Sequence, residues 1–572
     1  MLFINPAAEK FGGFVSRYVP VGIPVGIGFI CAYMEKHDIR CRVLDEEVET
    51  ITADRVREAL AGMPKPHVIG IGCLTAHVAR AYQIAQMIKA EIPDTIITVG
   101  GIHPTALPDE PLDQGVIDYV VRGEGEEIML QLYRALHGDD ESHDIRGVSF
   151  RKDGINCHNP DAPLFPDLDQ IPAFPYHLFE NPKYDMGFLT TSRGCPYRCS
   201  FCSQRMMTGT TYRFKSNDAI VDELETLVER YGQREIIFYD DNFCIKARRV
   251  IDLCDKIIER GLHTKVELAV QTRADNLVLQ GGDEVVKRMS EAGFTHASLG
   301  METGVQRLMD LTLKDETIDI HIEAVALCRR HGLGVSLGMI YGLPTETSQD
   351  RKDGFKIIED LKIKSTKFNN LIPYPGTPLY TDLVNSGRLN IQKDWSNFNS
   401  TLALTRSVFD KTPLPYVPET ASEWELKRDI IYYNLRAYLS FRTVMSLLNH
   451  TRSMGWVALP KRWYLNPAEI VEMAIVGSQV LINVLWAALP FRLTEPVMNW
   501  LNPELKKRPR IKAYKPDEHK SSDWDKAATR EKTKMLKSAR EEYTQTGAIS
   551  LKAGQKFDAG QSPEHTVGGA QS

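Results

Sequence analysis

The sequence predicts an α/β protein: a doubly wound Rossmann-like domain, then a partial (β/α)6 TIM-like barrel, then a mostly helical region. Three observations lead to this prediction. Short apolar runs alternate with helical stretches over residues 1–137, the alternation resumes at 187–382, and helical, aromatic sequence follows at 383–504. Continuous apolar strands separated by helices are typical of parallel sheets covered on both faces. Residues 138–186 are predicted to be a linker with a small hairpin, and 505–572 a basic, disordered tail.

Composition restricts the function classes. The chain has 572 residues and a formal net charge of −6, which does not favour a dedicated nucleic-acid binder. Its 10 cysteines are too few for a secreted disulfide scaffold of this length. The N-terminus shows no signal-peptide pattern. We therefore expect a cytoplasmic protein in which clustered cysteines bind metal or carry out chemistry.

The predicted strands of the N-terminal domain are closed by glycines or acidic residues. Ligands of doubly wound sheets lie beyond the carboxyl ends of the strands, so these ends are the expected site. We predict strands at residues 2–4, 41–44, 68–72, 95–99 and 116–121, and helices at 24–36 and 79–92.

The barrel region repeats a strand–helix unit six times in about 190 residues, which suits a full or partial (β/α) barrel. In this fold the chemistry also takes place at the carboxyl ends of the strands. The predicted strands lie at residues 188–190, 235–239, 266–270, 296–300, 335–340 and 367–371.

Three cysteines follow the first barrel strand within one loop: Cys195, Cys199 and Cys202. Thiolates are soft ligands that select iron–sulfur clusters or zinc. Three of them suit a four-iron cluster with one open iron, because full ligation takes four cysteines. The alternatives are a zinc knuckle without its fourth ligand, or unligated core cysteines. No Cys or His follows within ten residues to complete a zinc site.

These cysteines lie in a pattern that resembles the radical S-adenosylmethionine (SAM) superfamily. The pattern is Cys195-x3-Cys199-x2-Cys202, with the aromatic Phe201 before the third cysteine. Segments after later strands match the same family, and together they cover residues 187–380. They are Tyr239-Asp240-Asp241-Asn242-Phe243, Gly300-Met301-Glu302-Thr303 and Gly338-x-Ile340-x-Gly342-x-Pro344-x-Glu346.

The resemblance implies that the three cysteines hold a [4Fe-4S] cluster whose open iron binds SAM. Reductive cleavage of SAM would then give a 5′-deoxyadenosyl radical. Two of the residues that would contact SAM have structural alternatives. Glu302 could form a salt bridge at the barrel end, and Asp240 could cap a helix. The residues expected to bind SAM are Phe201, Asp240, Arg273, Glu302, Gly338 and Gly342.

A doubly wound domain directly before such a barrel is similar to the cobalamin-binding domain of cobalamin-dependent radical SAM enzymes. The Asp-x-His-x-x-Gly motif that supplies a histidine ligand to cobalt in other cobalamin proteins is absent. The alternatives are a sheet without cofactor, or a methylthiotransferase-type domain with a second cluster. The residues expected near cobalamin are Leu74, Thr75, Gly100, Gly101, His103, Gly123, Glu124 and Gly125.

An apolar helix is predicted at residues 468–489, with Glu472, Gln479 and Asn483 as a narrow polar stripe. Its length is close to the thickness of a bilayer core. A basic segment, residues 506–512, follows. A buried packing helix, a contact with the membrane surface and a true span are all compatible with this pattern.

The motifs together predict an enzyme: a cobalamin-dependent radical SAM enzyme acting on an unactivated carbon of a hydrophobic small molecule. Methyl transfer is the expected outcome. The alternatives are oxidative cyclisation or ring rearrangement, as in the anaerobic magnesium-protoporphyrin ester cyclase, and a non-catalytic metal-binding scaffold. An electron donor such as flavodoxin or ferredoxin is the expected partner, with no nucleic acid. The expected location is the cytoplasm, with a peripheral membrane contact as an alternative.

Overall fold

The computed structural model describes most of the first 438 residues and a short stretch near residue 490. Residues 1–521 form one compact unit, and the described residues all belong to it. The predicted tail at 505–572 lies outside them. The described residues are 1–7, 21–138, 142–392, 394–405, 409–438, 471, 478, 481–501 and 503.

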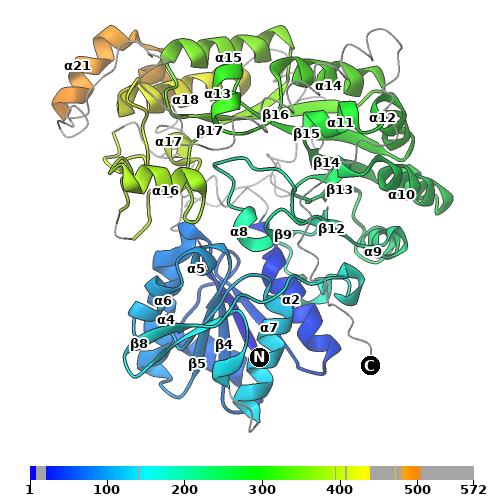
Figure 1. Ribbon diagram of the computed structural model, residues 1–572, viewed down its shortest axis with the longest axis vertical. Coiled ribbons are helices and arrows are strands. Elements are labelled where there is room, and N and C mark those ends of the chain that lie inside the picture. The colour runs from blue at the N-terminus through cyan, green and yellow to red at the C-terminus, as the bar shows by residue number, and fades with distance from the viewer. Residues whose placement is uncertain are drawn as a thin grey trace, which may run out of the picture. The chain divides into compact units, whose positions relative to one another are not determined.

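The N-terminal region is built on a seven-stranded sheet of order β3-β1-β4-β5-β6-β7-β8, drawn in blue and cyan in Figure 1. The first five strands in this order are parallel to one another. They are β1 (Leu2–Asn5), β3 (Arg42–Asp45), β4 (Val68–Gly72), β5 (Ile96–Gly100) and β6 (Tyr119–Val121).

Helices cover both faces of this sheet, as its apolar strands require. On one face α3 and α4 pack against the strands, and on the other α2 and α7 do so. The helices and the 3-10 turn η1 are α2 (Val25–Lys36), α3 (Ala53–Leu60), η1 (Thr75–His77), α4 (Val78–Glu91), α5 (Ile102–Ala106), α6 (Asp109–Asp113) and α7 (Gly125–His137).

The hairpin predicted within the linker extends this first sheet. Its strands, β7 (Val148–Lys152) and β8 (Ile155–His158), pair antiparallel, and β7 pairs with β6. Val148 and Phe150 are buried against α7, so apolar burial holds the hairpin at the sheet edge. Further along, β9 (Tyr184–Asp185) pairs with β2 (Val21–Gly22).

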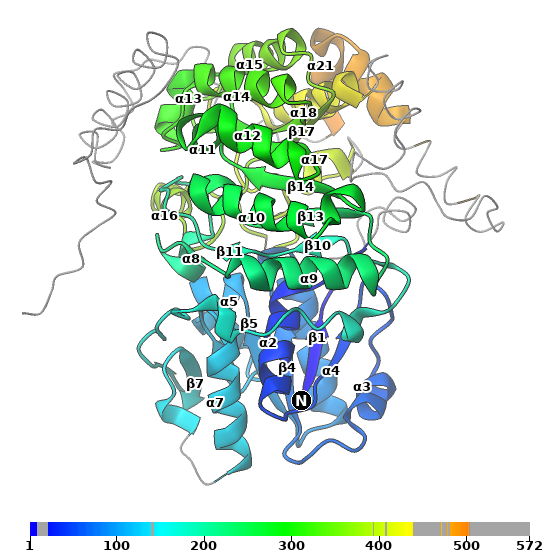
Figure 2. The same cartoon turned by 90° about the vertical axis from the view of Figure 1, so that its right-hand side faces the viewer.

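The barrel region contains a six-stranded parallel sheet of order β10-β13-β14-β15-β16-β17, which confirms the predicted partial (β/α)6 architecture. In Figure 2 the helices α9, α10, α12, α14 and α15 follow one another along the outer side of this sheet. The strands are β10 (Phe188–Leu189), β13 (Glu235–Phe238), β14 (Glu267–Thr272), β15 (Phe294–Glu302), β16 (Gly334–Tyr341) and β17 (Ser365–Asn370).

Each barrel helix follows its strand, and several start on a side-chain cap. Ser216 caps α9, Thr317 caps α14, and Thr347 forms a capping box with Asp350 on α15. The barrel helices are α9 (Asn217–Glu229), α10 (Ala247–Glu259), α11 (Ala274–Leu279), α12 (Gly282–Glu291), α13 (Gln306–Leu311), α14 (Ile318–Arg330) and α15 (Ser348–Asp360).

Beyond the barrel the chain continues with helices and one long connection among its described residues. After α16 (Pro378–Asn385) the segment 386–401 forms no helix in its described residues, and it returns to the N-terminal region. There Trp395 and Phe398 are buried in the same apolar core as α3 and α4. The segment therefore ties the end of the barrel to the first sheet. The helices α17 (Leu402–Thr405) and α18 (Glu423–Tyr438) follow it.

The helix predicted at 468–489 falls mostly outside the described residues. Residues 481–488 are helical, Pro490 follows, and α21 (Phe491–Leu501) continues the chain. In the part of the chain that the structure describes, no helix has both the length and the apolar character that crossing a membrane requires.

Candidate active site

The three cysteines lie in the loop between β11 (Ser192–Arg193) and α8 (Arg205–Thr208), just past the carboxyl end of β10. Cys195, Cys199 and Cys202 are all partly exposed, whereas most other cysteines are buried. The backbone N–H of Cys202 donates to the carbonyl of Cys199 at 3.1 Å, which folds the second half of the loop into a tight turn. The sequence spacing and this turn place all three thiols in one loop at the strand end.

Glycine is required where this loop begins. Gly194 has φ +89, and a Cβ there would lie 2.0 Å from the carbonyl oxygen of Thr211. Its N–H donates to the carboxylate of Asp241 at 3.0 Å. Burial raises the pKa of Asp241 to about 6. A side chain at position 194 would push the cysteine loop away from β12 (Arg213–Phe214).

Asp240 is the residue that fixes the start of the loop. It is buried at the carboxyl end of β13 and accepts four hydrogen bonds, from the backbone N–H and hydroxyl groups of Thr191 and Ser192. This carboxylate was considered as a SAM contact or a helix cap, and in the structure its hydrogen bonds go to Thr191 and Ser192. It holds the strand-to-loop turn that precedes the cysteines.

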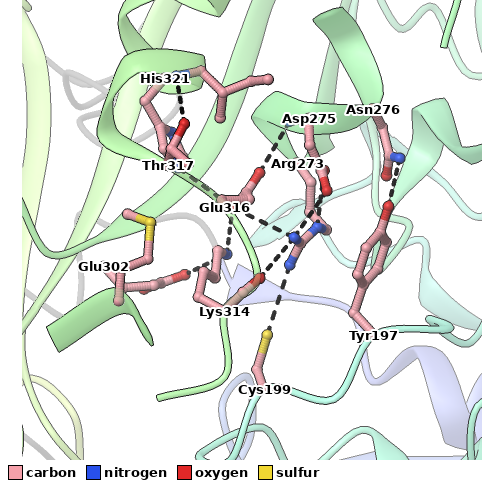
Figure 3. A network of polar contacts seen from close by, with 12 residues as sticks. Tyr197, Cys199, Arg273, Asp275, Asn276, Glu302, Lys314, Glu316, Thr317 and His321 are labelled. Carbon is pink, nitrogen blue, oxygen red and sulfur yellow. Dashed lines mark hydrogen bonds and ion pairs between the residues drawn. The ribbon is translucent and has the colours of Figure 1, made fainter. Parts of the chain in front are cut away.

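Arg273 lies directly behind the cysteine loop, at the end of β14. Its guanidinium forms two bonds with Asp275 at 3.0 Å and donates to the carbonyl of Lys314 at 2.8 Å. The remaining nitrogen, Nη1, lies 3.7 Å from Sγ of Cys199, and the guanidinium carbon is 3.6 Å from the ring centre of Tyr197. Figure 3 shows Arg273 between Asp275 and Cys199. Most of its hydrogen-bonding capacity is used by the protein.

A buried charge network continues from Arg273 (Figure 3). Lys314 reaches Glu302 at 3.2 Å and Glu316 at 3.5 Å, and His321 lies 3.3 Å from Glu316. Burial works to raise the pKa of Glu316, but Arg273, His321 and Lys314 hold it well below its usual range. Burial likewise works to lower the pKa of Lys314, and Glu302 and Glu316 reverse this. Both groups are therefore charged at neutral pH.

Glu302 ends β15 at the edge of this network and is partly exposed. It has φ +65, at a register shift between β15 and β16. Its carboxylate folds back over Gly300, where a Cβ would lie 2.4 Å from Oε1. The salt bridge considered from the sequence is thus formed, with Lys314 as the partner. The glycine in this motif makes room for the carboxylate.

The motif on the next strand joins the barrel to α18. Gly338 pairs with Gly300 across the strands, and Gly342 has φ +92 with Leu426 of α18 2.9 Å from the position of a Cβ. The N–H of Gly342 donates to Glu346 at 2.6 Å. Phe201 of the cysteine loop packs into a neighbouring apolar cluster with Leu308, Leu343 and Leu371. Phe201 is therefore an anchor for the loop.

The residues expected near cobalamin gather at the carboxyl ends of β4, β5 and β6. Leu74 follows β4 with an exposed side chain, whereas Thr75 is buried at the start of η1. Gly100 ends β5, and Gly101 follows with φ +116. A Cβ on Gly101 would lie 2.7 Å from the carbonyl of Cys73, so only glycine fits this close contact between the two strand ends.

His103, expected near cobalamin, lies one turn beyond the end of β5. It is buried in α5, its ring packs edge-on against Trp395 at 5.0 Å, and Nε2 lies 3.5 Å from Glu110. The indole N–H of Trp395 donates to the same Glu110 at 2.8 Å. In the structure His103 therefore belongs to the contact that anchors the segment after α16.

Gly123, Glu124 and Gly125 form the turn into α7, which contacts the β11–β12 hairpin beside the cysteine loop. Gly123 has φ +81 with open space beside it, and Gly125 packs under Ile30. Glu124 forms bonds of 2.7 Å with both Nη atoms of Arg213 on β12 and one of 3.2 Å with Arg193 on β11.

Glu126 reinforces this contact, because it also pairs with Arg193, at 2.5 Å. Burial works to raise the pKa of Glu124, yet Arg213 and Arg193 lower it. The turn is thus held by charge to the hairpin that flanks the cysteine loop.

The residues present fit the cofactors that the sequence implies. No three His, Cys, Asp or Glu side chains in the described residues converge as one metal ion would require. The three thiols suit instead a cluster, in which each cysteine binds a different iron. At the other edge, Gly123 has open space beside it and the Leu74 side chain is exposed, so this strand end could admit a large flat ligand.

Sequence reasoning missed Asp275, Lys314, Glu316 and His321. Asp275 follows Arg273 by two residues, and Lys314 and Glu316 lie in the loop after α13. Polar residues are common at the ends of strands and helices, so their positions only weakly indicate a functional site. Their convergence depends on packing of α11 against α14. Only the fold brings them together.

Two family models match the chain. The Radical SAM superfamily model matches residues 189–357, and the B12 binding domain model matches residues 14–132. An uncharacterized methyltransferase of Pyrococcus horikoshii is 30% identical over 408 residues, which are 70% of this chain and 86% of that protein.

Other relatives have more specific names. The anaerobic magnesium-protoporphyrin IX monomethyl ester cyclase of Cereibacter sphaeroides is 26% identical, over 67% of this chain and 63% of that protein. The hopanoid C-2 methylase of Rhodopseudomonas palustris is 29% identical, over 66% of each chain.

Solved structures show the same fold. The radical SAM methyltransferase TsrM from Kitasatospora setae, with cobalamin and a [4Fe-4S] cluster bound, superposes with a TM-score of 0.59 at 18% identity. That match covers 87% of this chain and 98% of TsrM. The cobalamin-dependent enzyme OxsB gives a TM-score of 0.60 at 16% identity, over 96% of this chain and 81% of OxsB.

The chain therefore belongs to the radical SAM enzymes that carry a B12-binding domain. It is an enzyme of α/β fold, and its cofactors are a [4Fe-4S] cluster, SAM and cobalamin. Its relatives are methyltransferases and a cyclase.

Proposed function

We propose that the protein transfers a methyl group to an unactivated carbon of a hydrophobic small molecule. The observation that carries the proposal is the ion-paired contact between Glu124 and the β11–β12 hairpin. Glu124 belongs to the turn proposed to bind cobalamin, and Arg193 precedes the cysteine loop by one residue. A methyl donor and a radical source held side by side are what radical methylation needs, because the substrate radical must meet the methyl group before it is quenched.

In this proposal Cys195, Cys199 and Cys202 hold the cluster, with cluster and SAM bound in residues 187–382 and cobalamin in 1–137. When bound, the cluster and SAM supply a 5′-deoxyadenosyl radical, and cobalamin carries the methyl group. The open space beside Gly123 would give cobalamin close access to the end of β6, Gly100 and Gly101 let the neighbouring strand ends pack closely, and Leu74 would face the cofactor with an apolar side chain.

Other residues of the chain fix the cysteine loop in place and shape the surface around the proposed SAM site. Asp240 and Asp241 fix the cysteine loop through Thr191, Ser192 and Gly194. Glu302 is the SAM-facing carboxylate, since it is partly exposed and its partner Lys314 holds it at the barrel end. Phe201, Gly338 and Gly342 shape the surrounding surface. Arg273 contributes through Cys199 rather than as a free anion-binding group.

Product analysis tests the reaction type. With SAM labelled in its methyl group, methylation places the label in the product and yields S-adenosylhomocysteine and 5′-deoxyadenosine in equal amounts, because one SAM donates the methyl group and a second gives the radical. Oxidative cyclisation, the second candidate, yields 5′-deoxyadenosine without label transfer. It is favoured by the 26% identity to the magnesium-protoporphyrin ester cyclase. Label-free product would overturn the methyl-transfer proposal.

We further propose a low-potential electron donor such as flavodoxin or ferredoxin, because SAM cleavage needs one electron per radical. The proposed location is the cytoplasm. A first measurement is the iron and cobalt content of anaerobically reconstituted, desalted protein. About four irons and one cobalt per chain support the assignment of both cofactor sites. Four irons without cobalt would refute methyl transfer from cobalamin.

A further inference from the structure

The last described segment of the chain carries an unusual concentration of exposed apolar side chains. Of the 17 large hydrophobic residues that are exposed in the described part of the chain, eight fall within residues 481–501. Trp500 is 79% exposed and Leu493 is 64% exposed. The eight are Leu481, Ile482, Leu485, Leu489, Leu493, Val497, Trp500 and Leu501. We call them the apolar face.

These side chains form a stripe along the two helices. Leu481 and Leu485 are four residues apart in the helix 481–488, and Leu493, Val497 and Leu501 continue the same spacing in α21. Residues four apart lie on one side of a helix. The apolar face is therefore continuous within each helix.

The opposite side of the same helices packs against α18. Ala487 and Met498 are buried with Trp424 and Ile431 of α18, and Trp486 and Phe491 flank that contact. This buried side also contains the polar residues Asn483 and Thr494. Asn483 was predicted from the sequence to mark the polar stripe of an amphipathic helix. The helix pair therefore has apolar side chains on both sides, buried against α18 on one and exposed on the other.

The outer side of both helices exposes its large apolar side chains to solvent. Contiguous exposed apolar surface on soluble proteins marks an interaction site. Directly after the helices, residues 505–512 carry five basic side chains and no acidic one: Lys506, Lys507, Arg508, Arg510 and Lys512. An apolar helix face next to a basic cluster matches a bilayer surface with anionic headgroups.

We propose that the apolar face rests on the surface of an anionic lipid bilayer and holds the enzyme there as a peripheral protein. Leucines of both helices enter the boundary between headgroups and acyl chains, and Trp500 lies at the interface, where tryptophan side chains concentrate. The basic sequence after α21 matches the charge of such headgroups. This surface lies outside the catalytic machinery, so the proposal stands or falls independently of the reaction type.

Vesicle binding by the full-length protein tests the proposal. Co-sedimentation is measured with phosphatidylcholine vesicles with and without phosphatidylglycerol. We expect binding that needs phosphatidylglycerol and weakens with added salt. The double variant Leu485→Gln/Leu493→Gln should lower the bound-to-free ratio by about tenfold. The matched control is Ile155→Gln, which changes an equally exposed residue on β8 and should leave binding unchanged.

Quenching by brominated lipid locates the contact. Brominated chains should quench part of the tryptophan fluorescence of the wild type, and Trp500→Phe should remove most of that quenching while vesicle binding persists. Absence of vesicle binding by the wild type would overturn the proposal. So would a double variant that still binds vesicles but dissociates a dimer, which would assign the face to a second copy. A double variant that loses thermal stability without any wild-type vesicle binding would assign it to internal packing.

Discussion

The two large sheets carry different kinds of side chain at the carboxyl ends of their parallel strands. At the barrel edge, charged side chains are buried and paired with one another: Arg273 with Asp275, and Lys314 with Glu302 and Glu316. At the N-terminal edge, between β4 and β6, the chain presents glycines with positive φ and an exposed leucine. The first edge positions groups by electrostatics, whereas the second has few side chains and, in our proposal, binds cobalamin.

This difference follows the two cofactors. A cluster with anionic thiolates and a zwitterionic SAM needs fixed charges, which a low-dielectric setting strengthens. A corrin ring is large and flat and needs backbone that can approach it. The Glu124–Arg213 contact joins the two edges, and it is itself a buried ion pair. The predictions below test one edge against the other.

The largest effect is expected from Cys199→Ala. Loss of one thiolate from a three-thiolate set should abolish SAM cleavage and lower the iron content, while cobalamin binding to the N-terminal edge is retained. Iron, cobalt and 5′-deoxyadenosine are measured on the same preparation. Cys157→Ala, on the β8 hairpin, is the control and should change none of the three. Loss of cobalt together with iron would show that the two edges are not independent.

Glu316→Gln should destabilise the barrel edge by about 3–5 kcal/mol, because it leaves Lys314 and Arg273 with less compensation in a buried site. The depressed pKa of Glu316 adds stability that is present above its unfolded pKa and lost as pH falls through its folded pKa. Urea unfolding near neutral pH and in acid measures both effects. Glu229→Gln, an exposed partner of Lys265, should cost far less. An unchanged midpoint in Glu316→Gln would contradict the account of this network.

The effect of Glu346 on stability depends on pH in the opposite direction to that of Glu316. Burial raises its pKa from 4.5 to about 7, although Arg351 on α15 opposes this, while Asp350 and Asp429 of α18 add to it. The folded state then binds a proton that the unfolded state has lost. Stability should fall by up to about 3 kcal/mol as pH rises from 4.5 to 7.

Glu346→Gln tests this by removing the titrating group. Between pH 4.5 and 7 the free energy of unfolding of the variant should therefore change much less with pH than that of the wild type. Glu359→Gln changes a more exposed carboxylate on α15, is the control, and should keep the wild-type pH dependence of stability. A slope that persists in Glu346→Gln would assign the titration to another residue.

The smallest effect belongs to the glycine edge. Gly101→Ala should cost about 1–3 kcal/mol through its positive φ and the contact with the Cys73 carbonyl. It should also weaken cobalamin binding without changing iron content. Gly62→Ala has a positive φ but no neighbouring atom within 4 Å, so it isolates the cost of φ alone. Equal effects of the two variants on cobalamin affinity would remove Gly101 from the proposed site.

Much of the fold could be predicted from local sequence. The strand predicted at 68–72 coincides with β4, and each of the six predicted barrel strands overlaps an observed one. Strand alternation and the spacing of Cys195, Cys199 and Cys202 are local properties, so they can be recognised from the sequence alone. The extent of β15, which ends at a register shift beside Gly300, depended on its neighbour β16.

The sequence by itself determined the α/β class, the six barrel strands and the pattern of three thiols in one loop. Only the tertiary structure decided what the polar residues around that loop do: Asp240 holds a turn, Arg273 is paired with Asp275, and His103 is buried under Trp395. It also decided that the hairpin of β7 and β8 extends the first sheet. The physical reason is that periodicity and thiol spacing are fixed within a few residues, whereas the partner of a buried charge comes from a distant segment.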